Sequence, residues 1–195
     1  MLKAEMLIYM PDLRTPRLRL RKLTMRDAAD IYRYSRDPEV ARHVLWDAHR
    51  SIGDSRAYLR YMLRRYRSHE PASWGIELME TGQIIGTIGF MWVQEDNAAA
   101  EVGYSLSRDH WGKGYMTEAL RAVIQYGFDV IGLHKVQICV RPSNTPSRKV
   151  IEKCGFVYEG NLRDYFLMPD GTFEDRMYFS ILKSEFKKTE EKNRV

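Results

Sequence analysis

Short apolar runs separated by turn-forming residues recur along the chain, and their length and composition are typical of β-strands. In the run at 101–106, Val102, Tyr104 and Leu106 fall on one side of an extended backbone. A Glu-Thr-Gly turn at 80–82 joins two other runs in the manner of a hairpin. The pattern predicts strands over residues 18–23, 74–79, 83–93, 99–106, 134–140, 156–160 and 177–182.

Other stretches repeat their apolar residues at the spacing of an α-helix. Thr24 is a suitable N-cap, with Asp27 in the first turn, for a helix that ends at Asp37-Pro38. Gly132 lies where a later helix should stop. The pattern predicts helices over residues 25–35, 39–44, 51–69 and 145–154, a helix from a glycine turn near 114 to residue 131, and a loop over 45–50.

The order of these elements is strand, helices, three antiparallel strands, helix, strand, helix and final strands, which is typical of an α+β fold. The chain has 195 residues and no linker of proline, glycine or serine divides it. We therefore expect a lead-in over 1–13, a single domain over 14–184 with a sizeable core, and a frayed basic tail over 185–195.

The net charge of +5 is unevenly placed, because arginines cluster before residue 27 and again on the helix predicted at 51–69. Arg56, Arg60 and Arg64 share one face of that helix. This face is either solvated or attracts acidic material such as a ribosome, nucleic acid or an acidic substrate. Basic and aromatic residues do not interleave as in RNA-binding modules, so we expect no specific nucleic-acid partner.

Cysteine and histidine content argue against a metal site. The two cysteines and five histidines show no metal-binding spacing, and reduced thiols are typical of the cytosol. The apolar run at 7–10 is too short for a signal sequence or a membrane span. We therefore expect a cytoplasmic protein without metal or membrane attachment.

A turn with two glycines joins the strand at 99–106 to the next helix. Gly112 and Gly114 allow positive φ angles and the close approach of a ligand to the backbone. Unpaired amides at the start of the helix, together with its dipole, then form an anion site that suits a pyrophosphate. The loop lacks the Gly-Lys-Ser/Thr of a Walker motif, and Thr117 replaces the third glycine of the dinucleotide motif.

With three further motifs, this turn resembles the GCN5-related N-acetyltransferases, especially the RimJ/RimL-like branch that acetylates the N-termini of ribosomal proteins. The matching segments are Thr-Pro-Arg-Leu-Arg-Leu-Arg at 15–21, Trp-Gly-Lys-Gly-Tyr with Thr-Glu-Ala at 111–119, Asn-x-x-Ser at 144–147 and Glu-Lys-x-Gly-Phe at 152–156. The resemblance runs from about residue 13 to 184. One departure is Asp109, where the family often has Gln or Arg; Arg108 or Lys113 would then supply the missing charge.

The resemblance implies a mixed, mostly antiparallel seven-stranded sheet flanked by helices and splayed between its fourth and fifth strands, with acetyl-CoA in the opening. Backbone amides of the loop would hold the pyrophosphate, and those of the strand at 102–106 would hold the pantetheine arm and polarise the acetyl oxygen. The cofactor-binding residues implied are Val102, Tyr104, Leu106, Asp109, Trp111, Gly112, Lys113, Gly114, Tyr115, Met116, Thr117 and Asn144.

Two residues are expected to carry the catalytic chemistry. By resemblance, Ser147 protonates the departing thiolate. Glu101 is the first candidate for a general base, directly or through a water, although a charge at a strand end is an equally simple interpretation. Asp164, Asp175 and Glu77 are weaker candidates, and an amine that arrives neutral needs no dedicated base.

The expected reaction transfers the acetyl group of acetyl-CoA to a primary amine by direct attack in a ternary complex. The N-terminal amine of a protein or peptide, such as a ribosomal protein, is the first candidate. The alternatives are a small-molecule amine (a polyamine, an aminoglycoside or an amino acid) and a non-catalytic acyl-CoA-binding regulatory protein. Trp46, Trp92, Tyr104 and Tyr165 are candidates for lining the acceptor pocket, although aromatic core is the default interpretation of such residues. A homodimer is a family-level expectation.

Overall fold

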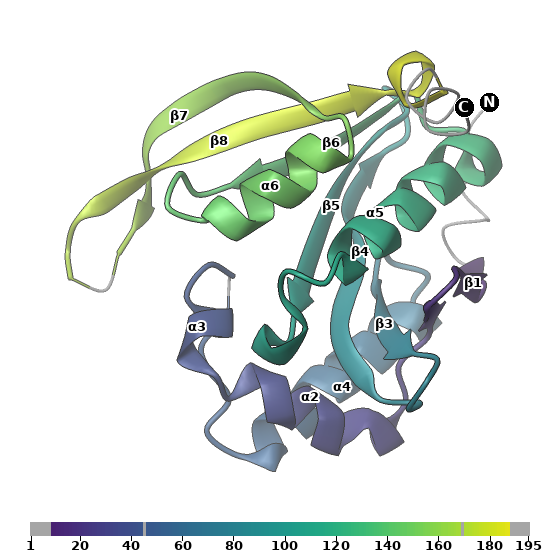
Figure 1. The fold of residues 1–195 in the computed structure, drawn as a ribbon, viewed down its shortest axis with the longest axis vertical. Coiled ribbons are helices and arrows are strands. Elements are labelled where there is room, and N and C mark those ends of the chain that lie inside the picture. The colour runs from purple at the N-terminus through teal and green to yellow at the C-terminus, as the bar shows by residue number, and fades with distance from the viewer. Residues whose placement is uncertain (1–8, 45, 169, 188–195) are drawn as a thin grey trace.

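Eight strands form one sheet in the order β1-β2-β3-β4-β5-β6-β8-β7 (Figure 1). The computed structural model describes residues 9–44, 46–168 and 170–187. The strands are β1 (Leu13–Arg14), β2 (Leu18–Arg21), β3 (Ser73–Leu78), β4 (Ile84–Gln94), β5 (Ala99–Leu106), β6 (Lys135–Val140), β7 (Val157–Leu167) and β8 (Phe173–Leu182). The helices are α2 (Ala28–Ser35), α3 (Pro38–Ala41), α4 (Ile52–Arg67), α5 (Tyr115–Tyr126) and α6 (Thr145–Lys153), with 3-10 turns at Met25–Asp27 and Arg108–His110.

The predicted α+β class is confirmed, with two differences in the strands. The sheet has eight strands instead of the seven that the resemblance implies, because Leu13–Arg14 pairs with Arg19 and Leu20 as a short edge strand. In addition, β7 and β8 are longer than the strands predicted at 156–160 and 177–182 and form a hairpin that projects beyond the rest of the sheet (Figure 1). The predictions for residues 1–8 of the lead-in, for Leu45 and for 188–195 of the tail lie outside the described residues.

The sheet opens between β5 and β6, which are its one parallel pair among the described strands. These strands are paired only from Ala99 with Lys135 to Glu101 with Gln137. Beyond that point β5 continues to Leu106 beside β4 alone. This is the predicted splay between the fourth and fifth strands, counted without β1, and it leaves one backbone edge of β5 open.

Two hydrophobic cores support the sheet on its two sides. The larger core lies between the sheet and α5 and α6, with Trp74 fully buried at its centre, edge-on to Phe90 and Tyr126. The smaller core packs α2 and α4 against the other side. Ile84 and Ile85 are consecutive in β4 and point into different cores, as the alternation of a strand requires.

The segment after α5 continues to Ile131 as one wider helical turn and stops at Gly132, whose φ of 91° allows the reversal. The predicted end of this helix is thus confirmed. Within residues 9–44, 46–168 and 170–187 we find no helix long and apolar enough to cross a bilayer. The same residues contain no group of three or more His, Cys, Asp or Glu side chains that could hold a metal ion.

Candidate active site

Two cavities meet where β5 and β6 separate. The first, here called the α5 cavity, has a volume of about 410 Å³ and extends to the N-terminus of α5. The second, the α4 cavity, has about 560 Å³ and extends to α4 and the β7–β8 hairpin. Both are lined by His43, Val44, Tyr104, Ser105, Asn144 and Ser147. Two molecules bound at the same time, one in each cavity, would therefore meet at these residues.

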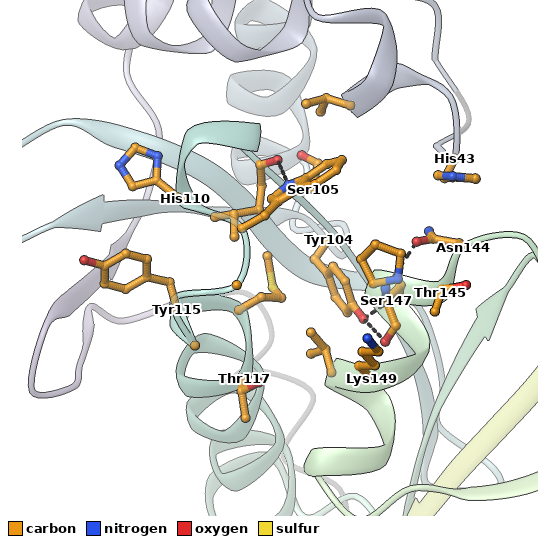
Figure 2. A pocket seen from close by; sticks show the side chains of 18 of the residues that line it. His43, Tyr104, Ser105, His110, Tyr115, Thr117, Asn144, Thr145, Ser147 and Lys149 are labelled. Atoms are coloured by element: carbon orange, nitrogen blue, oxygen red, sulfur yellow. Dashed lines mark hydrogen bonds between the residues drawn. The ribbon is translucent and has the colours of Figure 1, made fainter.

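Most of the predicted site residues line the α5 cavity (Figure 2). They are Tyr104, Leu106, Trp111, Gly112, Gly114, Tyr115, Met116, Thr117, Asn144 and Ser147. Val102 and Glu101 line the α4 cavity instead. Asp109 and Lys113 line neither cavity, and both side chains are exposed. The structure thus brings the loop, β5 and the start of α6 together around one space.

The glycine loop presents backbone amides to the α5 cavity. Gly112 and Gly114 have φ angles of 74° and 82°. A Cβ at Gly112 would meet no atom within 4 Å, so the backbone conformation, and not lack of space, requires glycine there. Gly114 caps α5, and its carbonyl accepts a hydrogen bond from the amide of Glu118. The amides of residues 115–117 have no partner within the helix and lie at its positive end, which fits a pyrophosphate.

Trp111 fixes one side of this loop. Its ring packs against both hydrophobic cores, and its Nε1 donates a 2.8 Å hydrogen bond to the carbonyl of Leu106. The indole therefore anchors the loop to the end of β5 and to the body of the protein.

Arg17, immediately before β2, braces the other side of the loop. Its Nε and its backbone amide donate to the carboxylate of Glu118 at 2.7 and 2.9 Å, and its Nη1 donates to the carbonyl of Lys113 at 3.0 Å. The guanidinium also lies over the ring of Tyr115, 4.4 Å from its centroid. Arg17 thus contacts both the loop and the first turn of α5, and its donors are used in holding them.

A hydrogen bond between two hydroxyls crosses the opening of the sheet. Ser147 lies in the first turn of α6, and its Oγ is 2.7 Å from the hydroxyl of Tyr104 on β5 (Figure 2). Burial raises the pKa of Tyr104, so this phenol keeps its proton at neutral pH. Asn144 caps α6 by accepting from the amide of Ser147 at 3.2 Å through Oδ1, which leaves its side-chain nitrogen available to donate.

Glu101 lies at the last pair between β5 and β6 and is 7% exposed. Both of its oxygens are bonded: Nη2 of Arg176 is 3.2 and 3.3 Å away, and Gln137 Nε2 is at 3.1 Å. Cys139 Sγ lies at 3.4 Å, and burial followed by the charge of Glu101 raises the pKa of that thiol to about 11. Both oxygens of the Glu101 carboxylate therefore already accept hydrogen bonds from protein donors.

Some of the remaining predicted residues line a cavity and others do not. Of the aromatic residues named as candidates for the acceptor pocket, Trp46, Tyr104 and Tyr165 line the α4 cavity and Trp92 does not. The weaker base candidates line neither cavity; they are Glu77, Asp164 and Asp175. Cys154 is buried and lines neither cavity, so its thiol is not available as a nucleophile.

Sequence reasoning missed several lining residues. Lys149 and Lys153 reach the α5 cavity from α6 and bring positive charge that the residue at 109 does not. The two lysines are four residues apart and therefore share one face of α6, which is the sequence signal that could have identified them. His43 and Arg176 come from segments distant in sequence, and no local pattern marks them as site residues.

Comparison with known proteins identifies the family. Residues 17–157 match the family model for the acetyltransferase (GNAT) domain. This chain belongs to the GNAT acetyltransferase family. It is 36% identical over 177 residues to "Uncharacterized N-acetyltransferase p20" of Bacillus licheniformis, covering 91% of this chain and 99% of the relative. A GNAT acetyltransferase from Bacillus anthracis superposes with a TM-score of 0.80 at 25% identity, over 90% of this chain and all of that one.

The predicted family and activity are thus confirmed: the protein is an acetyl-CoA-dependent N-acetyltransferase. Two more relatives differ in the acceptor that they are named for. The ribosomal-protein-serine acetyltransferase of Escherichia coli is 30% identical over 108 residues, 55% of this chain and 60% of its own, which supports the RimJ/RimL-like branch. The spermidine N(1)-acetyltransferase of Vibrio cholerae is 28% identical over 103 residues, 53% of this chain and 59% of its own.

Because the hydrogen-bond donors of Arg17 hold the glycine loop and α5, removal of its side chain should weaken acetyl-CoA binding without slowing the chemical step. We expect Arg17→Ala to raise the Kd for acetyl-CoA about tenfold and to leave kcat at saturating acetyl-CoA unchanged. Isothermal titration and steady-state kinetics measure the two effects. Arg19→Ala is the matched control, since Arg19 bonds Asp12 away from the loop. An unchanged Kd in Arg17→Ala would contradict the bracing role.

Proposed function

We propose that this protein transfers the acetyl group of acetyl-CoA to the N-terminal amine of a protein or peptide, by direct attack in a ternary complex. The observation that carries the proposal is the meeting of the two cavities at Tyr104, Ser105, Asn144 and Ser147. Acetyl-CoA in the α5 cavity and an amine in the α4 cavity would place thioester and nucleophile side by side. Such positioning supplies much of the rate in a transfer that needs no covalent intermediate.

In this proposal the chain binds acetyl-CoA mostly through its backbone. The amides of residues 115–117 hold the pyrophosphate, and the open edge of β5 over 102–106 holds the pantetheine arm and polarises the acetyl oxygen. The side-chain nitrogen of Asn144 donates to a pantetheine carbonyl. Lys149 and Lys153 add positive charge at the rim of the cavity. The predicted roles of Asp109 and Lys113 are limited to their backbone, since their side chains lie outside both cavities.

Ser147 is the proposed acid for the departing thiolate. Its hydroxyl is held by Tyr104 at the junction of the cavities, where the sulfur of the thioester would lie. The Tyr104 hydroxyl orients Ser147 and can replace the proton that Ser147 gives up. A thiolate is a modest base, so a hydroxyl donor within hydrogen-bond reach stabilises it even before the proton is transferred.

Charge in the α4 cavity favours a peptide over a polyamine. Three arginines line it, Arg65, Arg141 and Arg176, against a single carboxylate, Glu101, which is already paired with Arg176. Several ammonium groups on one acceptor would be repelled there, whereas one N-terminal ammonium followed by acidic residues would be matched. The polyamine alternative therefore requires a cavity of the opposite charge.

The surroundings of the α4 cavity also suit a macromolecular acceptor. Tyr165 at its edge is half exposed, and Leu167 and Phe173, paired across the β7–β8 hairpin, are 67% and 58% exposed. Exposed apolar side chains of this kind, beside a cavity, are typical of a protein contact. On α4, the predicted basic face of Arg56, Arg60 and Arg64 is exposed and would attract an acidic partner.

Removing the Ser147 hydroxyl should slow turnover with little effect on acetyl-CoA binding. We expect Ser147→Ala to lower kcat about 100-fold, the lower range for loss of a general acid, while the Kd for acetyl-CoA stays the same. Ser143→Ala is the control, because Ser143 is exposed and lines neither cavity. Wild-type turnover in Ser147→Ala would exclude the acid role.

Acceptor charge should decide activity. In an assay of thiol release, peptides with acidic residues after the N-terminus should exceed both peptides with basic residues and spermidine in kcat/KM. Arg141→Glu should narrow this preference about tenfold, because it reverses one charge in the cavity. Arg163→Glu, on an exposed part of β7, is the control. If spermidine is the best acceptor, the proposed acceptor class is wrong and the small-molecule alternative holds.

A further inference from the structure

His43 lies at the junction of the two cavities. It follows α3 and is among the few residues that line both spaces, together with Tyr104, Asn144 and Ser147. In Figure 2 its ring lies on the same side of the α5 cavity as Asn144 and across it from Tyr115. This is where an amine in the α4 cavity would approach a thioester in the α5 cavity.

The imidazole is not committed to another side chain, in contrast to Glu101. Nδ1 of His43 is buried and has no hydrogen-bond partner among the described residues. The oxygens of Glu101 instead receive donors from Arg176 and Gln137, which an incoming ammonium would have to displace. Glu101 also lines the α4 cavity alone, so it lies to one side of the junction.

The surroundings of His43 favour its neutral form. Burial, followed by the positive charges of Arg42 and Arg141, lowers the pKa of His43 below its ordinary value. Glu174 on β8 and Glu39 on α3 act in the opposite sense and are outweighed. A neutral imidazole near pH 7 can accept a proton, and a shift of this direction extends that ability to a more acidic pH.

We infer that His43 is the general base that takes the proton from the acceptor ammonium. The freed nitrogen lone pair attacks the acetyl carbonyl carbon, an N–C bond forms and the C–S bond breaks. The second amine proton goes to solvent as the amide forms. The thiolate takes a proton from the Ser147–Tyr104 pair, and that pair regains a proton from solvent. His43 then returns its proton to solvent. The inference rests on the proposed function, since it places the acceptor in the α4 cavity.

The test is the pH dependence of kcat, measured with whichever primary amine the wild-type enzyme turns over best. A base whose pKa lies below about 6.5 gives a wild-type kcat that falls on the acid side of that value. In His43→Gln we expect this acid limb to disappear and kcat at pH 7.5 to fall about 100-fold. Added imidazole should restore part of the rate to His43→Ala. Acetyl-CoA binding and the thermal midpoint of both variants establish that they are folded.

Two variants serve as controls for the limb. His110→Gln removes a histidine whose Nδ1 is also buried and has no hydrogen-bond partner within the described part of the chain. Burial lowers the pKa of His110 too, but His110 lines the α5 cavity alone. It should keep the acid limb, whatever its effect on the KM for acetyl-CoA. Glu101→Gln should keep the limb as well.

Two results would overturn the inference: a limb that persists in folded His43→Gln with kcat close to that of the wild type, or a limb that disappears in Glu101→Gln instead. Both are independent of the acceptor panel. A wild-type enzyme that prefers spermidine would refute the proposed acceptor. The ratio of kcat in His43→Gln to kcat in the wild type would still decide the role of His43.

Discussion

The open edge of β5 is the constraint around which the rest of the site is built. Buried backbone N–H and C=O groups need partners, and β5 has β4 along one edge but loses β6 on the other after Glu101. A ligand with its own amide groups can take the place of the missing strand, as an added peptide does at the edge of a sheet. The pantetheine arm of acetyl-CoA has this chemistry. The N-terminus of α5, the loop before it and the start of α6 all surround the open edge.

Rigid packing keeps this edge open. The larger core holds β2–β5 against α5, and the smaller core fixes α2 and α4 beneath the α4 cavity. Trp111 touches both cores and is bonded to the end of β5, so the binding loop is tied to the same framework as the strand. Ser147 and Tyr104 then face each other from opposite walls. Side chains carried by packed helices and strands keep the fixed geometry that catalysis by positioning requires.

How much of the site can be predicted from the sequence depends on how far apart along the chain the contacting residues lie. The glycine loop, the cap by Asn144 and the stop at Gly132 are local, and each follows from the conformational needs of a few neighbouring residues. The decisive pairs of the site are not local. Ser147 and Tyr104 are 43 residues apart, and Arg176 and Glu101 are 75 apart. A single sequence carries no periodic or motif signal for such pairs.

The role proposed for His43 escapes sequence reasoning for the same reason. Histidine in a loop after a short helix has no distinguishing local pattern, and its meaning comes from the two cavities that it borders. Glu101 illustrates the converse: its place on β5 follows from the sequence, but its contact with Arg176, which occupies its oxygens, does not.

The bond from Arg17 to Glu118 joins positions 101 residues apart. Closing so long a loop costs chain entropy that is recovered only when the sheet and α5 are both in place. The brace can therefore form only when both elements are in place. During synthesis β2 leaves the ribosome long before α5, and the early chain has nothing with which to complete the brace. Firm capture of acetyl-CoA is therefore expected only from a chain in which β2, the loop and α5 are all present.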